Sequence, residues 1–228
     1  MINDNTKLNS RDRAVLMKTR FLQGLSPALT VSMMQTMTIV SLPARRQVFR
    51  TGDPAEAFYC VLGGYVRLYR LNKDGREADI RICAPGDTFA ECLLYADGPY
   101  PFHAQTAENA TLARFDMATV RKLAAEQAEV ARAVMASLSR DLITTMDCVA
   151  NDRLFTAPQR VAQYLASLCP VDDGQAAIRL PFQKNLLAGK LGLAPEALSR
   201  AFSSLRKTGV TVRGRMIQVG DVQALRDF

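Results

Sequence analysis

The chain has 228 residues, of which 48% are hydrophobic and 22% are charged, a balance typical of a globular protein with a buried core. Its formal net charge of +7 favours a polyanionic partner such as nucleic acid. The excess is concentrated in residues 152–228, which hold 11 lysines and arginines against 6 acids, whereas residues 1–151 hold 18 against 16. The cysteines are too widely spaced for metal or redox motifs and predict reduced thiols; they are Cys60, Cys83, Cys92, Cys148 and Cys169.

The first 20 residues are polar and charged, and no apolar run approaches the roughly 20 residues of a membrane-spanning helix. We therefore expect a cytoplasmic protein with no membrane partner. Residues 1–20 are predicted to form a loose or helical arm. Ser26 followed by Pro27 predicts the start of a short helix, because the missing N–H of proline costs nothing in a first turn.

Residues 47–115 have a different pattern, in which short alternating runs such as 65–69 and 80–82 are separated by turn signals. Those signals are Gly, Pro, Asn and Asp clusters within residues 51–54, 63–64, 72–75, 85–87 and 97–99. Short strands with turns every eight to twelve residues or so are typical of an antiparallel sandwich or jelly roll.

Residues 117–151 contain no glycine or proline and are predicted to form one long helix. Its apolar positions recur with a period of about seven, which a helix needs to pack along a second helix. The alternative is that this stripe lies on the sheet of its own chain. We favour self-association, because the stripe is longer than a small roll can cover. The predicted dimerisation residues are Met135, Leu138, Leu142, Thr145 and Val149, and Ala128 and Ala131 continue the stripe.

The strongest functional signal lies in residues 181–208. A helix over 182–191 is followed by Gly192, which permits a tight turn, and Pro195 begins a second helix. This helix buries Leu198, Phe202 and Leu205 and presents Glu196, Ser199 and Arg200 on its exposed face. The arrangement predicts a helix-turn-helix whose second helix reads base edges in the major groove. Arginine can donate two hydrogen bonds to guanine, and glutamate can accept one from cytosine.

The remainder of this region predicts a helix from residue 156, a strand over 178–180 and a two-stranded wing. The wing pairs residues 210–212 with 216–219 around a basic tip. A solvated face with incidental charge is the alternative, but the glycine turn, the basic tip and the charge asymmetry together favour DNA binding. The predicted phosphate contacts are Lys184, Arg206, Lys207, Arg213 and Arg215.

Two motifs resemble the Crp/Fnr family of regulators: Pro-Glu-Ala-Leu-Ser-Arg at 195–200 and Thr-Gly-Asp-Pro-Ala-Glu-Ala-Phe-Tyr at 51–59. The resemblance implies an α+β chain with a cyclic-nucleotide-binding-like β-roll and arm (1–116), a dimerisation helix (117–151) and a winged helix-turn-helix (152–228). It also implies a homodimer that binds an inverted-repeat DNA site and recruits RNA polymerase as an activator. Crp-type members carry arginine where this chain has Pro195, which indicates an Fnr-like half-site similar to TTGA.

The same resemblance bears on the effector. Glu91 matches the cyclic-nucleotide members, but Gly98-Pro99 stands where they carry Arg-Ser, so the phosphate loses its counter-charge and cyclic AMP is disfavoured. The first cysteine is Cys60, which excludes the N-terminal iron–sulfur cluster of Fnr. The segment is similar to the Dnr/NnrR branch, whose members respond to nitrogen oxides, some through haem. The predicted effector pocket comprises Phe89, Glu91, Cys92, Tyr100, Phe102 and His103.

His103 is the only histidine, and it is either a haem ligand or a partly exposed strand residue. The leading hypothesis is a DNA-binding regulator gated by nitric oxide or low oxygen, and the second is a regulator responsive to cyclic AMP or cyclic GMP. A module that uses the roll alone is disfavoured by the recognition helix. An enzyme is disfavoured because no nucleophile–histidine pair, metal-ligand set or phosphate-binding glycine loop is present. The effector's identity and the target genes stay open.

Overall fold

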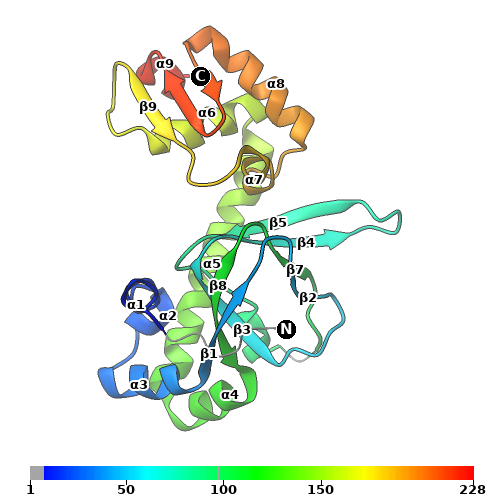
Figure 1. Ribbon diagram of the computed structural model, residues 1–228, viewed down its shortest axis with the longest axis vertical. Coiled ribbons are helices and arrows are strands. Elements are labelled where there is room, and N and C mark those ends of the chain that lie inside the picture. Colours follow the sequence, from blue (N-terminus) through cyan, green and yellow to red (C-terminus); the bar gives the residue numbers. More distant parts are fainter. Residues whose placement is uncertain (1–7, 97) are drawn as a thin grey trace. The chain divides into compact units, whose positions relative to one another are not determined.

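The computed structural model describes residues 8–96 and 98–228. Residues 1–7 of the predicted arm and Asp97 of the predicted effector segment lie outside these described residues. The chain divides into two compact units, residues 1–144 and 145–228, and the long helix α5 contributes to both. Helices and antiparallel sheets occur in each unit, which confirms the predicted α+β class (Figure 1).

The first unit opens with three short helices, α1 (Ser10–Met17), α2 (Arg20–Gln23) and α3 (Pro27–Gln35). The predicted helix at Ser26-Pro27 is confirmed, with Pro27 in its first turn. Capping oxygens set the first two: the Asn9 side chain accepts from the N–H of Asp12, and the Thr19 side chain accepts from the N–H of Leu22. Buried side chains attach these helices to the core of the roll; they are Leu16, Phe21, Leu22 and Met33.

Two four-stranded antiparallel sheets form the roll and confirm the predicted sandwich. One sheet has the order β1-β8-β3-β6 and the other the order β2-β7-β4-β5. The strand predictions began at residue 47 and missed β1, which follows α3 without a turn signal and pairs with β8 over six residues. The strands are β1 (Met37–Leu42), β2 (Gln47–Phe49), β3 (Ala57–Gly63), β4 (Val66–Leu71), β5 (Glu77–Cys83), β6 (Thr88–Phe89), β7 (His103–Thr106) and β8 (Ala110–Asp116).

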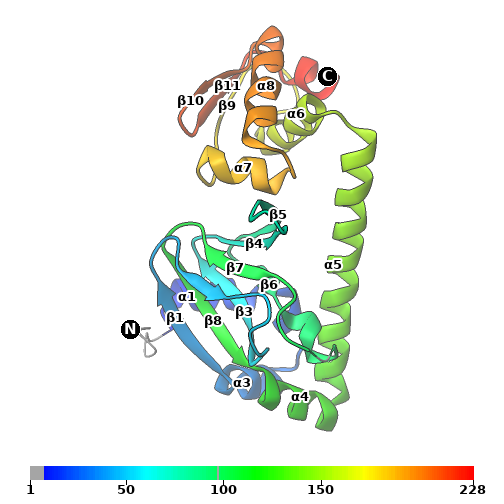
Figure 2. The ribbon, with the colours of Figure 1, turned by 90° about the vertical axis from the view of Figure 1, so that its right-hand side faces the viewer.

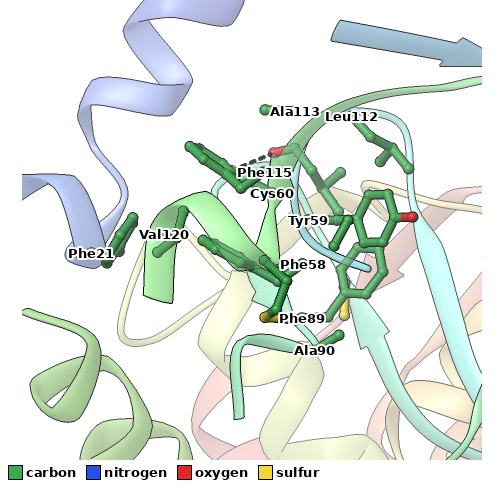
Figure 3. Packing of buried hydrophobic residues seen from close by; sticks show 14 of the residues in the cluster. Phe21, Phe58, Tyr59, Cys60, Phe89, Ala90, Leu112, Ala113, Phe115 and Val120 are labelled. Atoms are coloured by element: carbon green, nitrogen blue, oxygen red, sulfur yellow. Dashed lines mark hydrogen bonds between the residues drawn. The ribbon is translucent and has the colours of Figure 1, made fainter. Parts of the chain in front are cut away.

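Aromatic rings fill the interior of the roll (Figure 3). Phe58 and Phe115 stack with their centroids 4.8 Å apart, and Phe21 meets Phe58 edge-on at 5.8 Å. Tyr59 stacks on Phe89 at 5.2 Å. Offset and edge-on pairs of this kind add about 0.5–1.5 kcal/mol each beyond the area that they bury. The interior is therefore densely packed with side chains of the chain itself.

The predicted single helix over 117–151 is wrong in one respect, because it is two helices, α4 (Met117–Glu126) and α5 (Ala128–Leu154). Gln127 between them has extended backbone angles, φ −127° and ψ 100°. At 3.6 residues per turn, the buried residues of α4 and those of α5 would point about a third of a turn apart in one straight helix. The break lets both sets face the roll: Met117, Val120 and Ala124 of α4, and Val130, Ala133, Val134 and Ser137 of α5.

The second unit contains the end of α5, a three-stranded sheet of order β10-β11-β9 and four further helices (Figure 2). Its helix α9 (Val222–Arg226) was not predicted. Across the described residues, no helix combines the length and the apolar character needed to cross a bilayer. The elements of this unit are α6 (Ala157–Leu168), β9 (Ala176–Arg179), α7 (Lys184–Lys190), α8 (Pro195–Leu205), β10 (Thr211–Arg213) and β11 (Met216–Val219), with a 3₁₀ turn at η2 (Arg206–Thr208). The first unit also has a 3₁₀ turn, η1 (Glu91–Leu94).

Candidate nucleic-acid interface

Helices α7 and α8 are joined by a tight turn at Gly192, whose φ of +60° lies in the left-handed region that favours glycine. The N–H of Leu193 donates to the carbonyl of Ala188 at 2.9 Å and closes the turn. Pro195 then occupies the first turn of α8. The sequence prediction of a helix, a glycine turn and a second helix is confirmed.

Helix α8 is strongly amphipathic. One side buries Leu198, Phe202 and Leu205, together with Ala201, and packs mainly against α6. The other side presents the predicted base-reading residues Glu196, Ser199 and Arg200, and all three are exposed. Because they stand at i, i+3 and i+4 in the first two turns, their polar groups share one face. This face offers a carboxylate, a hydroxyl and a guanidinium to an approaching base edge.

A groove of about 320 Å³ separates α8 from the wing formed by β10 and β11. Its walls include Ser199 and Arg206 on one side and Val212 of the hairpin on the other. Lys184, at the start of α7, also lines it, and the Lys184 Nζ lies 4.5 Å from the centre of the Phe202 ring. This cation–π contact holds the ammonium group at the groove, where it can meet a phosphate oxygen.

The two arginines at the wing tip have different surroundings. Arg213 is exposed, as are Arg206 and Lys207, so each is free to approach a phosphate. Arg215 instead donates from Nε to the carbonyl of Leu180 at 2.9 Å and from Nη2 to the carbonyl of Pro181. These bonds fasten the hairpin to the segment before α7. Arg215 therefore has a positioning role in this structure that the sequence did not indicate.

The predicted dimerisation stripe lies largely on the exposed face of α5. Met135 is 52% exposed, Leu142 61% and Val149 46%, whereas Leu138 is half-buried against the core of the roll. Thr145 is exposed as well. The prediction omitted three further exposed apolar side chains of α5: Met146 lies next to the stripe, Ile143 lies farther round the helix, and Leu154 lies beyond residue 151, where the predicted helix ended.

The predicted effector residues differ in their surroundings, and several of them are packed into the core of the roll. Phe89 and Tyr100 are buried in the interior of the roll, and the Tyr100 ring stacks on Phe49 at 3.6 Å. The Tyr100 hydroxyl donates to the carbonyl of Ala57 at 2.6 Å and accepts from its N–H at 3.1 Å. Phe102 packs half-buried beside Phe49, at 5.8 Å. The aromatic members of the predicted pocket are thus core residues with satisfied polar groups.

Glu91 is 6% exposed and lies beside a narrow hollow that is closed to water-sized molecules. The Thr88 hydroxyl donates to Glu91 Oε1 at 2.5 Å. Burial raises the pKa of Glu91 to about 7, although the Thr88 hydrogen bond opposes this effect. Cys92, the next residue, is exposed. The hollow also touches Phe21, Phe58, Leu94, Val134 and Ser137.

His103 stacks on Tyr69, with centroids 4.9 Å apart, and its Nδ1 accepts a hydrogen bond from the N–H of Thr51 at 3.3 Å. Because Nδ1 accepts this hydrogen bond, the ring proton lies on Nε2, so neither ring nitrogen of His103 offers a lone pair to a haem iron in this arrangement. The surroundings of His103 therefore do not fit a haem that it would hold. Nor do residues 8–96 and 98–228 contain a group of three or more His, Cys, Asp or Glu side chains suited to a metal ion.

Comparison with known proteins bears on both units. Residues 39–127 match the cyclic nucleotide-binding domain family, and residues 159–228 match the Crp-like helix-turn-helix domain family. The chain is 25% identical over 217 residues to the CRP-like cAMP-activated global transcriptional regulator of Mycobacterium tuberculosis, covering 92% of this chain and 96% of that protein.

Two solved structures are also similar. FixK2 from Bradyrhizobium japonicum is 28% identical with a TM-score of 0.69, covering 84% of this chain and 96% of that one. The sensor domain of the transcriptional regulator DNR from Pseudomonas aeruginosa is 30% identical with a TM-score of 0.52, covering 59% of this chain and 91% of that one.

Proposed function

The chain belongs to the Crp/Fnr family of transcription regulators, and on that premise we propose that it binds an inverted-repeat DNA site as a homodimer. The observation that carries the proposal is the exposed face of α8, where Glu196, Ser199 and Arg200 lie above a fully buried apolar side. A surface helix with no partner has no need to group a carboxylate, a hydroxyl and a guanidinium in its first two turns.

The proposed half-site is similar to TTGA, which contains one G·C pair. Arg200 would donate two hydrogen bonds to the guanine O6 and N7 of that pair, and Glu196 would accept one from the cytosine amino group. Ser199 would contact a base or a phosphate. Lys184, Arg206, Lys207 and Arg213 would meet the sugar–phosphate backbone on either side, which fixes the register of the helix in the groove.

The proposed dimer forms along α5. Its 27 residues span about 40 Å. The apolar side chains exposed along it would be buried if another apolar surface packed against the helix. A second copy of α5 offers the same stripe and gives a two-fold seam of the coiled-coil type. Such a dimer presents two recognition helices to half-sites one DNA turn apart. We further propose that the bound dimer recruits RNA polymerase and so acts as an activator.

An effector bound to the roll would control DNA binding in this proposal. Nitric oxide or oxygen sensed through haem was the leading hypothesis, but the contacts of His103 do not fit a haem ligand. The proposal therefore gives haem no part in the control of DNA binding. The visible absorption spectrum of freshly purified protein tests this assignment. No Soret band is expected, and a Soret band that survives gel filtration would contradict it.

A cyclic nucleotide is the second candidate, because residues 39–127 match the cyclic nucleotide-binding domain family and Glu91 is present. Two features oppose it: Gly98-Pro99 supplies no counter-charge for the phosphate, and the Glu91 carboxylate is already bonded to Thr88. Titration calorimetry with cyclic AMP and cyclic GMP separates these possibilities. Micromolar binding would establish the second candidate.

Fluorescence anisotropy tests the DNA-binding proposal. The probe is a duplex with two TTGA half-sites centred one helical turn apart, and the competitor has the same base composition with both half-sites scrambled. We expect the intact site to bind at least about a thousandfold more tightly at physiological salt, as specific regulators do. Equal affinities for both duplexes would refute sequence-specific binding.

A further inference from the structure

A polar groove of about 330 Å³ lies on the first unit, away from the interior of the roll. Three parts of the chain form it: the segment joining α1 to α2, the end of β5 with the turn that follows, and the middle of α5. None of the six residues that the sequence predicted for the effector pocket lines this groove. Aromatic rings stack on one another in the roll interior, whereas this groove is lined mainly by polar side chains.

Cations dominate the groove. Lys18 and Arg20 enter from the N-terminal helices, and Arg81 enters from β5. The two acids there, Asp87 and Asp141, already pair with Arg81, at 3.6 Å and 3.2 Å. Within the described part of the chain, neither Lys18 nor Arg20 forms an ion pair. The groove therefore keeps two cations whose charge is not compensated by a carboxylate of the chain.

Hydroxyl groups complete the polar lining, since Ser137 and Thr144 of α5 border the same groove. The Thr144 hydroxyl donates to the carbonyl of Arg140 at 3.0 Å, so Ser137 is the hydroxyl donor of this set. Lysine and arginine combined with hydroxyl donors are the groups with which proteins bind phosphate oxygens. The volume exceeds that of a bare phosphate and leaves room for the organic part of a small ester. Lys18, Arg81 and Thr144 come from segments that are distant along the chain, so only the fold brings this set together.

We propose that this groove binds a small phosphate-bearing molecule, with its phosphate between Lys18 and Arg20 and against the outer side of Arg81. The ligand would bridge the N-terminal helices, β5 and α5, and it would bind the folded state only. This binding does not depend on the DNA-binding proposal, because no residue of the second unit takes part.

The test uses the full chain and a Lys18→Gln/Arg20→Gln double variant, with Arg11→Gln/Arg13→Gln as the matched control. All four side chains are exposed, so the variants should fold, and the control removes the same charge from α1 outside the groove. The probes are inorganic phosphate, glycerol 3-phosphate, malonate and uncharged glycerol at constant ionic strength. Thermal midpoints and titration calorimetry provide the readouts.

We expect both phosphates to raise the thermal midpoint of the parent chain in a concentration-dependent way. The double variant should bind at least about tenfold more weakly, since charge-assisted hydrogen bonds are lost, and the control should bind like the parent. Malonate binding as tight as that of glycerol 3-phosphate would overturn the phosphate assignment. Equal weakening in the control, or no binding of either phosphate to the parent, would overturn the site itself. The affinity of the same variants for DNA, measured in buffer without phosphate, would show separately whether the proposed function stands.

Discussion

Replacing Glu91 by glutamine tests how much the buried carboxyl group between the roll and α5 affects stability. This group borders a closed hollow that Val134 and Ser137 of α5 also line. Burial raises the pKa of Glu91 to about 7 from a usual value of 4.5. Glutamine keeps the shape of the side chain and the oxygen that accepts from the Thr88 hydroxyl, but it cannot ionise. The variant therefore removes the charge and little else.

The sign of the effect follows from the raised pKa. The folded state binds the Glu91 proton more tightly than the unfolded state, so the resulting stability is fully present below about pH 4.5 and is lost as the pH rises through about 7. Each pKa unit corresponds to about 1.4 kcal/mol, which makes the cost of the ionised carboxylate about 3 kcal/mol above neutral pH. At about pH 8, the free energy of unfolding of Glu91→Gln is therefore expected to exceed that of the parent by up to this amount.

Urea unfolding followed by circular dichroism, at about pH 5 and about pH 8, measures the difference. The matched control is Glu126→Gln, because Glu126 is exposed near the end of α4. We expect the gap between the Glu91 variant and the parent to widen with pH, and the control to follow the parent. If the parent and the Glu91 variant show the same dependence on pH, the carboxyl group ionises without penalty and the burial argument is refuted.

Three further predictions concern the seam, the turn and the wing. Leu142→Glu places a charge in the exposed stripe of α5 and should give a monomer in analytical ultracentrifugation; an unchanged dimer would place the interface elsewhere. Gly192→Ala should lower the free energy of unfolding by about 1–2 kcal/mol, because φ there is +60°. Denaturant titration measures this loss, and its absence would mean that the turn adopts another conformation. Arg213→Ala should reduce the salt slope of DNA binding by about 1, whereas Arg215→Ala should leave it unchanged, since its guanidinium bonds backbone carbonyls. Equal slopes for both variants would contradict this division.

The helix-turn-helix could be predicted from the sequence because its signals are local. Gly192 marks the turn, Pro195 begins α8, and the spacing of Leu198 and Phe202 defines the buried side, so the exposed side follows from helical periodicity alone. The two-sheet roll was predictable for a similar reason, since turn residues recur at short intervals. The family resemblance then connected these local patterns to a fold.

The effector region could not be predicted in the same way. Tyr100 follows a glycine–proline turn and looks available to a ligand, but its position against Phe49 depends on strands distant in the chain. The break at Gln127 has no glycine or proline to indicate it and arises because α4 and α5 bury different sides. The polar groove joins Lys18 to Arg81, which lie on elements that no local pattern connects.

The central claim is that α8 reads bases, and the most direct measurement is the affinity of the parent and Arg200→Ala for a complete set of single base-pair changes in the half-site. The claim predicts that Arg200→Ala costs about 1–3 kcal/mol on the intact site and loses discrimination at the G·C pair, while discrimination at the other positions persists. An equal loss on the intact site and on random DNA would contradict it, because Arg200 would then be a phosphate contact only.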